Sequence, residues 1–238
     1  MKNILFLFLF LFSLKLSIAQ NYETVEVNQI MLNNDTLITF PRINNCKYAD
    51  SINRHLNIYL QRYFLCYNID CVEDCILEAT KDGLFKLHYI PCFSDSTVSF
   101  IIDMAIKKED VVKNHRYYLT YSLKTGKQLA IEDLFPDYRE CDIYNYLLRA
   151  GDKALDIIYR DLYDRYKEGS IAQQDYEILK YRLRYFCFNS MWESFAVSKS
   201  TLLLDLGCFI PDELSEYVPS HIRIDINLMR SELEIGSE

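Results

Sequence analysis

The sequence predicts an α+β fold in which an antiparallel meander sheet is packed by helices, in one or two lobes. A series of β-type segments with short connections lies in the middle of the chain, between regions with helical spacing. Half of the 238 residues are hydrophobic and a quarter are charged, which is ordinary for a globular protein. The order helix, meander, helices, strands is typical of α+β rather than α/β folds.

The first nineteen residues have the pattern of a signal peptide. Lys2 supplies a positive charge, Ile4–Phe12 is unbroken apolar sequence, and Ser17–Ala19 places small residues before a cleavage site at Gln20. Lys15 interrupts the apolar run before it reaches the length of a membrane span, although an uncleaved anchor stays an alternative. We expect a periplasmic or secreted protein with no stable membrane insertion after cleavage.

The N-terminal part should contain two strands and two helices. Tyr22–Ile30 and Thr36–Phe40 alternate like strands. Apolar residues then recur at helical spacing from Ile52 to Phe64, with Asp50 or Ser51 as the N-cap, and Cys71–Thr80 forms a weaker helix.

The meander follows and is predicted to end in a hairpin. Its strands are expected at 84–90, 97–107 and 116–123. Gly126 should supply the turn, and 128–131 should pair back onto the strand before it.

The C-terminal part should begin with helices and finish with strands. Helices are expected at 138–167 and 171–186, with Gly151 as a possible break and Gly169 as the end of the first. Strands are expected at 193–198, 201–206 and 222–228, with a helix start at Pro211 between the last two. The polar tail from Ser231 is expected to be frayed.

The alternation of the strand 116–123 leads to a hypothesis about binding. Tyr117, Leu119 and Tyr121 share its more apolar face, which should cover the helix 52–64. The opposite face carries Tyr118 and Thr120. We therefore predict that Tyr118 and Thr120, with His115 at the entry to that face, contact a partner.

Eight cysteines follow the signal sequence, and four of them lie close together: Cys66, Cys71, Cys75 and Cys92. Because export leads to an oxidising compartment, at least one disulfide is expected within this group. The spacing of Cys71, Cys75, His88 and Cys92 also allows a structural zinc site, but His88 fits an ordinary strand position, and we predict no metal and no cofactor.

The charge and the motifs exclude several functional classes. The net charge of −8 disfavours nucleic acid as a partner, and six glycines leave no phosphate-binding loop. The chain has no motif for nucleophilic catalysis. Acids such as Asp133, Asp142, Asp161 and Asp164 are placed for helix termini, although a carboxylate pair in a hydrolase is the alternative.

Two stretches resemble known bacterial domain families. Phe40–Ile43 followed by Ser51–Asn53 is similar to the start of the domain of unknown function 4163, and the segment from Tyr117 through Thr125-Gly126-Lys127 to Asp133-Leu134-Phe135 resembles the domain of unknown function 3298. The resemblance implies a 4163-like part over 20–110 and a 3298-like part over 111–238. The chain departs from the second family just before the strand that contains Tyr117, where His115 is the one residue of the family's motif that is retained.

The resemblance implies a non-catalytic role in the bacterial envelope. Relatives of these families include the lysozyme-sensing extracellular part of an anti-sigma factor and the N-terminal region of a peptidoglycan deacetylase. We therefore expect an exported binding protein, not an enzyme, whose partner is a lysozyme-like protein or a cell-wall glycan. A hydrolase acting on envelope polymers is the rival interpretation.

Overall fold

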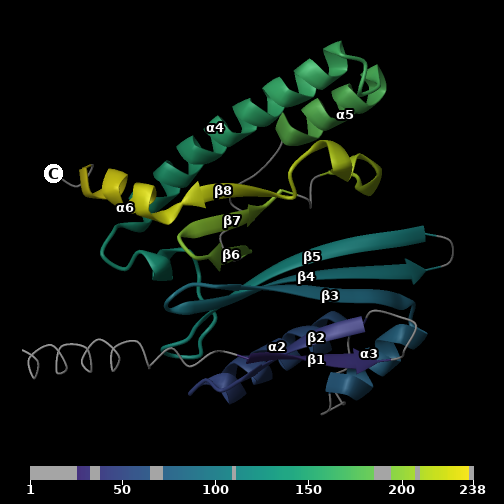
Figure 1. Ribbon diagram of the computed structural model, residues 1–238, viewed down its shortest axis with the longest axis vertical. Coiled ribbons are helices and arrows are strands. Elements are labelled where there is room, and N and C mark those ends of the chain that lie inside the picture. Colours follow the sequence, from purple (N-terminus) through teal and green to yellow (C-terminus); the bar gives the residue numbers. More distant parts are fainter. Residues whose placement is uncertain are drawn as a thin grey trace, which may run out of the picture.

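The structure, a computed structural model, describes residues 26–32, 38–64, 72–108, 111–184, 194–206 and 210–235. Two β-sheets lie against each other, and helices cover the outer face of each (Figure 1). The layers therefore follow the order helices, five-stranded sheet, three-stranded sheet, helices. The predicted α+β class is confirmed, and the fold places the two sheets back to back.

The five-stranded sheet, sheet A, contains strands β1 to β5 in sequence order. The strands are β1 (Glu26–Leu32), β2 (Ile38–Asn44), β3 (Leu84–Phe93), β4 (Thr97–Lys108) and β5 (Val111–Ser122). All neighbours are antiparallel except β2 and β3, which run parallel, with Ile38 opposite Leu87. Sheet A is therefore mixed, because the chain between β2 and β3 forms two helices instead of a hairpin.

Helices α2 (Ala49–Phe64) and α3 (Val72–Lys81) cover one face of sheet A. The stripe Ile52, Leu56 and Leu60 of α2 is buried against strand residues that include Phe100 and Leu119. This confirms the helix predicted from the apolar spacing, although it begins at Ala49, before the predicted caps. Burial of this apolar stripe is what stabilises the helix in place.

The three-stranded sheet, sheet B, is short and fully antiparallel. It contains β6 (Phe195–Ser198), β7 (Thr201–Asp205) and β8 (His221–Asp225) in that order. Its outer face packs against α4 (Glu140–Lys167), α5 (Gln173–Arg184) and α6 (Ile226–Ile235) in a second apolar core. Short 3₁₀ segments, η1 (Glu132–Leu134) and η4 (Asp212–Tyr217), complete the described elements.

Strand β6 joins the two halves, because it lies against β3, β4 and β5 of sheet A. Cys92, Ile101 and Tyr118 of sheet A form a small buried cluster with Ala196 and Leu203 of sheet B. Both faces of sheet A are thus covered, one by helices and the other by β6.

Several predicted boundaries differ from the observed ones. Strand β5 begins at Val111, five residues before the expected start, and it pairs with β4 along its length. A boundary between residues 110 and 111 therefore falls inside the β4–β5 hairpin. The expected return strand 128–131 is reduced to one bridge between Tyr121 and Gln128, followed by η1.

The C-terminal segment is a correction to the prediction. Residues from Ser231 were expected to fray, but Ile226–Ile235 forms α6, with Met229 and Leu233 buried. Gly151 does not break α4 either, since it lies buried inside a continuous helix. The polar residues Ser231, Glu232 and Glu234 made this segment resemble a frayed tail. It is an amphipathic helix whose apolar stripe contains only a few residues.

No helix in the described ranges is both long and apolar enough to cross a membrane. The predicted signal peptide, residues 1–19, lies outside those ranges.

Candidate functional site

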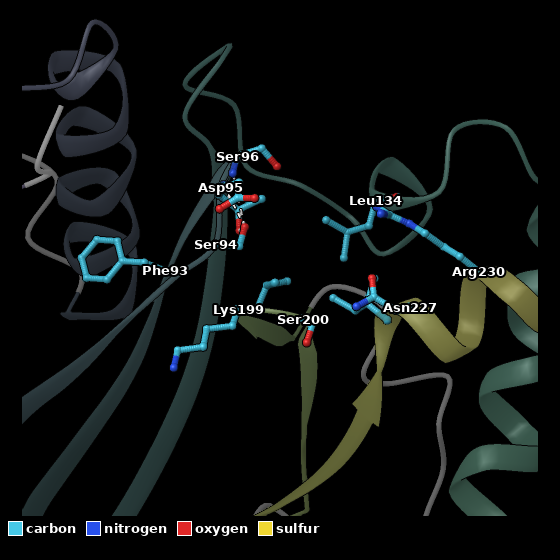
Figure 2. Close-up of a pocket in the computed structure, with 12 residues that line it drawn as sticks. Phe93, Ser94, Asp95, Ser96, Leu134, Lys199, Ser200, Asn227 and Arg230 are labelled. Atoms are coloured by element: carbon cyan, nitrogen blue, oxygen red, sulfur yellow. Dashed lines mark hydrogen bonds between the residues drawn. The ribbon is translucent and has the colours of Figure 1, made fainter. Parts of the chain in front are cut away.

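A pocket of about 550 Å³ lies between sheet A and sheet B, at one end of their contact. Three short segments form it: the β3–β4 turn of sheet A, the β6–β7 turn of sheet B, and the start of α6 (Figure 2). Leu134 of η1 completes one wall. We call this the inter-sheet pocket, and its lining residues are Phe93–Thr97, Leu134, Val197, Lys199, Ser200, Ile226, Asn227 and Arg230.

The β3–β4 turn holds its polar side chains in place through a local hydrogen-bond network. The Ser94 hydroxyl lies 2.7 Å from the Thr97 hydroxyl and accepts hydrogen bonds from the backbone N–H groups of Ser96 and Thr97. A Ser hydroxyl used in this way closes a turn that has no glycine. The turn therefore presents Asp95 at its tip as an exposed carboxylate.

The β6–β7 turn is connected to both halves by backbone hydrogen bonds. Lys199 has a positive φ of 55°, and its N–H donates to the carbonyl of Phe93 at 2.8 Å. The carbonyl of Ser200 accepts from the N–H of Ile226, also at 2.8 Å. One tight turn thus fixes sheet A, sheet B and α6 relative to one another around the pocket.

The start of α6 supplies an amide and a guanidinium. Asp225 caps the helix, since its Oδ1 accepts from the N–H groups of Asn227 and Leu228. One turn later, Arg230 donates to the carbonyl of Leu134 at 3.4 Å and lies over the ring of Phe135. Arg230 is thereby held at the rim of the pocket on the side of η1.

The lining of the inter-sheet pocket offers many hydrogen-bonding groups. Hydroxyls come from Ser94, Ser96 and Ser200, cations from Lys199 and Arg230, and Asp95 is the one acid among the described lining residues. Such a set can donate to and accept from a hydroxyl-rich or acidic ligand. Hydrolysis of glycosidic bonds usually needs two carboxyl groups, about 5–9.5 Å apart.

The predicted contact face on β5 is not a surface. Tyr118 and Thr120 are each 1% exposed, because β6 and β7 cover the face that they share. The Thr120 hydroxyl donates to the carbonyl of Phe195 at 2.6 Å and lies 2.9 Å from the Ser99 hydroxyl. The prediction that Tyr118 and Thr120 are exposed for a partner is therefore wrong. The partner of that face is sheet B of the same chain.

His115 is separated from Tyr118 and Thr120. It lies on the opposite face of β5, half-buried, with its ring stacked at 6.3 Å on Tyr117. Strand alternation requires this, since 115 and 117 are odd positions while 118 and 120 are even. The other half of that hypothesis is confirmed: Tyr117 and Tyr121 pack edge-on against Tyr59 and His55 of α2.

The predicted cysteine group is only partly described, because Cys66 and Cys71 lie outside the described residues. No disulfide joins any two of Cys46, Cys75, Cys92 and Cys141, so a bridge to Cys66 or Cys71 stays a prediction. Burial raises the pKa of the Cys92 thiol, which keeps it protonated. Within the described ranges, no three His, Cys, Asp or Glu side chains gather into a possible metal site.

Three of the acidic residues considered for a carboxylate pair have partners within the chain. Asp133 accepts from the N–H of Ala130, Asp142 pairs with Arg139, and Asp161 pairs with Arg165. The ion pairs join residues three or four positions apart on α4 or at its start. Asp133 and Asp142 thus lie at the start of a helix, as predicted, whereas Asp161 lies within α4 and not at its end.

The inter-sheet pocket was missed because its residues are turn residues from distant parts of the sequence. Ser94-Asp95-Ser96 and Lys199-Ser200 do stand between predicted strands, so the turns themselves were visible as connections. That the two turns face each other depends on how the sheets stack. No family model matches the chain, and no match was found among curated proteins either.

Proposed function

We propose that this chain is an exported, non-catalytic binding protein of the bacterial cell envelope, and that the inter-sheet pocket holds a cell-wall glycan. The observation that carries the proposal is the pocket itself, which is concave and lined by hydroxyl, amide and charged groups. Sugar hydroxyls both donate and accept hydrogen bonds, so they match this lining better than an apolar ligand does.

The predicted signal peptide and the resemblance to envelope domains support the location. The lining supports binding over catalysis, because Asp95 has no second carboxyl beside it among the described lining residues. A glycan suits the observed geometry better than a protein partner, because the tyrosine face that was predicted to receive a protein is buried.

Asn227 offers the sharpest test. Its side chain lines the pocket, while its backbone N–H, which Asp225 caps, is kept in an alanine variant. We expect soluble peptidoglycan fragments to bind the protein from Gln20 onward, and Asn227→Ala to weaken that binding about tenfold, as for loss of a side-chain hydrogen bond to a ligand. Isothermal titration calorimetry measures both affinities.

Asn145→Ala is the matched control, because Asn145 is an exposed asparagine on α4 that does not line the pocket. Its affinity should equal that of the unmodified protein. Equal binding by the Asn227 and Asn145 variants would place the ligand elsewhere. Binding of lysozyme without any binding of glycan would favour the protein partner, and release of new reducing ends would favour the hydrolase.

A further inference from the structure

A second, smaller pocket lies on the far side of sheet B, between α4, β8 and α6. Its volume is about 180 Å³. Three cations line it: Arg149 and Lys153, one turn apart on α4, and Arg223 on the neighbouring strand β8. We call it the α4–β8 pocket. None of its residues lines the inter-sheet pocket, so it is independent of the proposed function.

None of the three cations forms a direct ion pair within the part of the chain that the structure describes. None of Arg149, Lys153 and Arg223 forms an ion pair or a hydrogen bond with a described residue, whereas Arg116, Arg139 and Arg165 each pair with an acid. The whole chain is acidic, with a net charge of −8. Three basic side chains without direct ion pairs in one pocket therefore contrast with the negative charge of the chain as a whole.

Two acids, Asp225 and Glu232, also line the α4–β8 pocket, but neither forms an ion pair with the three cations. Asp225 uses Oδ1 to accept two N–H groups at the start of α6, which holds its carboxylate against the helix end. Glu232 stands on α6, and neither acid lies within 4.0 Å of a cationic nitrogen of the three. The lining keeps one positive charge in excess.

A hydroxyl completes the set. Tyr146 is 5% exposed and lines the same pocket from α4. Burial, together with the carboxylates of Glu232 and Asp225, raises the pKa of Tyr146. The phenol therefore stays protonated and can donate a hydrogen bond to an anion.

We propose that the α4–β8 pocket binds a phosphoryl group, with the Arg149 and Arg223 guanidinium groups and the Lys153 ammonium as its cationic contacts and the Tyr146 hydroxyl as an additional donor. A phosphoryl group presents several acceptor oxygens and up to two negative charges, so it can engage donors that approach from α4 and from β8 together. The small volume suits a single such group, and any larger molecule that carries it extends into solvent.

Titration calorimetry in a buffer without phosphate tests the site. Inorganic phosphate should bind the unmodified protein, and Arg149→Gln and Arg223→Gln should each weaken binding about tenfold, as for loss of a hydrogen bond to a charged group. Arg160→Gln is the matched control, because it removes the same charge from α4 but Arg160 does not line the pocket. Its affinity should stay unchanged.

A second ligand separates the sources of the group. Tighter binding of N-acetylglucosamine 1-phosphate than of inorganic phosphate would assign the site to a phosphorylated sugar, and equal binding would assign it to free phosphate. Absence of binding by both, or an equal loss in the Arg149, Arg223 and Arg160 variants, overturns the proposal. Thermal unfolding without ligand confirms that every variant is folded.

Discussion

The two faces of sheet A are both buried, but they are buried by different chemistry. On one face, Leu119 and Tyr121 of β5 pack among apolar residues of α2 and α3. On the other, Tyr118 and Thr120 meet β6, which is a strand and brings backbone carbonyl and N–H groups to the interface. A helix satisfies its own backbone, so only the second face needs polar side chains.

Hydroxyls meet this need along the contact between the sheets. The Ser99 hydroxyl accepts from the N–H of Val197 at 2.9 Å, and Thr120 donates to the carbonyl of Phe195. Strand β6 belongs to sheet B and forms no ladder with a strand of sheet A. The hydroxyls of Ser99 and Thr120 therefore serve as hydrogen-bond partners for backbone groups of β6. A strand face with alternating polar residues is thus not necessarily exposed, because a second sheet can use the same residues.

The face of β5 that carries Tyr118 is either buried core, as the structure has it, or an exposed contact surface, as the sequence suggested. Tyr118→Ala should change stability most, and it separates the two interpretations. Removing a fully buried aromatic ring from the cluster of Cys92, Ile101, Ala196 and Leu203 should lower the free energy of unfolding by about 3–5 kcal/mol, the range for such truncations. Urea unfolding measures it. A surface tyrosine would give a change of less than about 0.5 kcal/mol.

Tyr118→Phe is the control for that experiment. The Tyr118 hydroxyl is buried near the Arg116 guanidinium without a well-formed hydrogen bond, and burial raises its pKa. Replacing it with hydrogen keeps the ring and removes a polar atom that gains little. We expect this variant to unfold at the same urea concentration as the unmodified protein or at a higher one.

Thr120→Val should have an intermediate effect. The change keeps the shape of the side chain but takes the Thr120 donor away from the Phe195 carbonyl and removes one partner of the Ser99 hydroxyl, which still accepts from the N–H of Val197. A loss of about 1–3 kcal/mol in the free energy of unfolding follows from leaving buried polar groups unpaired. Urea unfolding again measures it.

Thr125→Val is the matched control for this change. Thr125 lies in the exposed turn after β5, where its hydroxyl accepts only a 3.4 Å contact from the N–H of Lys127. We expect almost no change in stability. If Thr120→Val were equally neutral, the hydroxyl contacts between the sheets would contribute nothing to holding them together.

The elements themselves were largely predictable from local sequence. The stripe Ile52, Leu56 and Leu60 and the alternation of β5 each reflect contacts that repeat at a fixed spacing, so they can be read without knowing the neighbour. The α+β class followed from their order. The short α6 was missed because β8 leads into it without a break, and Asp225, its cap, resembled one more polar strand position.

The candidate site could not be predicted in the same way. Its two turns are more than a hundred residues apart in the sequence, and they meet only because sheet B is stacked on sheet A through β6. The alternation of residues along a strand does not predict which residues of a second sheet will pack against that strand. The same stacking buried Tyr118 and Thr120, so the missed pocket and the wrong contact face have one cause.

The smallest expected effect concerns His221 of β8, which lies within electrostatic reach of Arg116 of β5. His221 of β8 is half-buried, and burial together with the positive charges of Arg223 and Arg116 lowers its pKa. Arg116 is itself paired with Asp103 in the facing sheet A, and the Ser220 hydroxyl lies 3.0 Å from His221 Nδ1. The folded protein therefore binds a proton at His221 less readily than the unfolded chain does.

This difference gives a definite sign to the pH dependence. Above the unfolded pKa of about 6.5, His221 is neutral in both states and costs nothing. As the pH falls below that value, the unfolded chain takes up the proton first, so the free energy of unfolding decreases until the folded protein is protonated as well. Urea unfolding in phosphate-free buffer between pH 7.5 and pH 5, about the window in which His titrates, measures the decrease. His221→Gln should remove part of it, and Arg223→Gln should reduce it by relieving the repulsion. A decrease of the same size in all three proteins would mean that the charge near β5 and β8 does not couple the two sheets to pH.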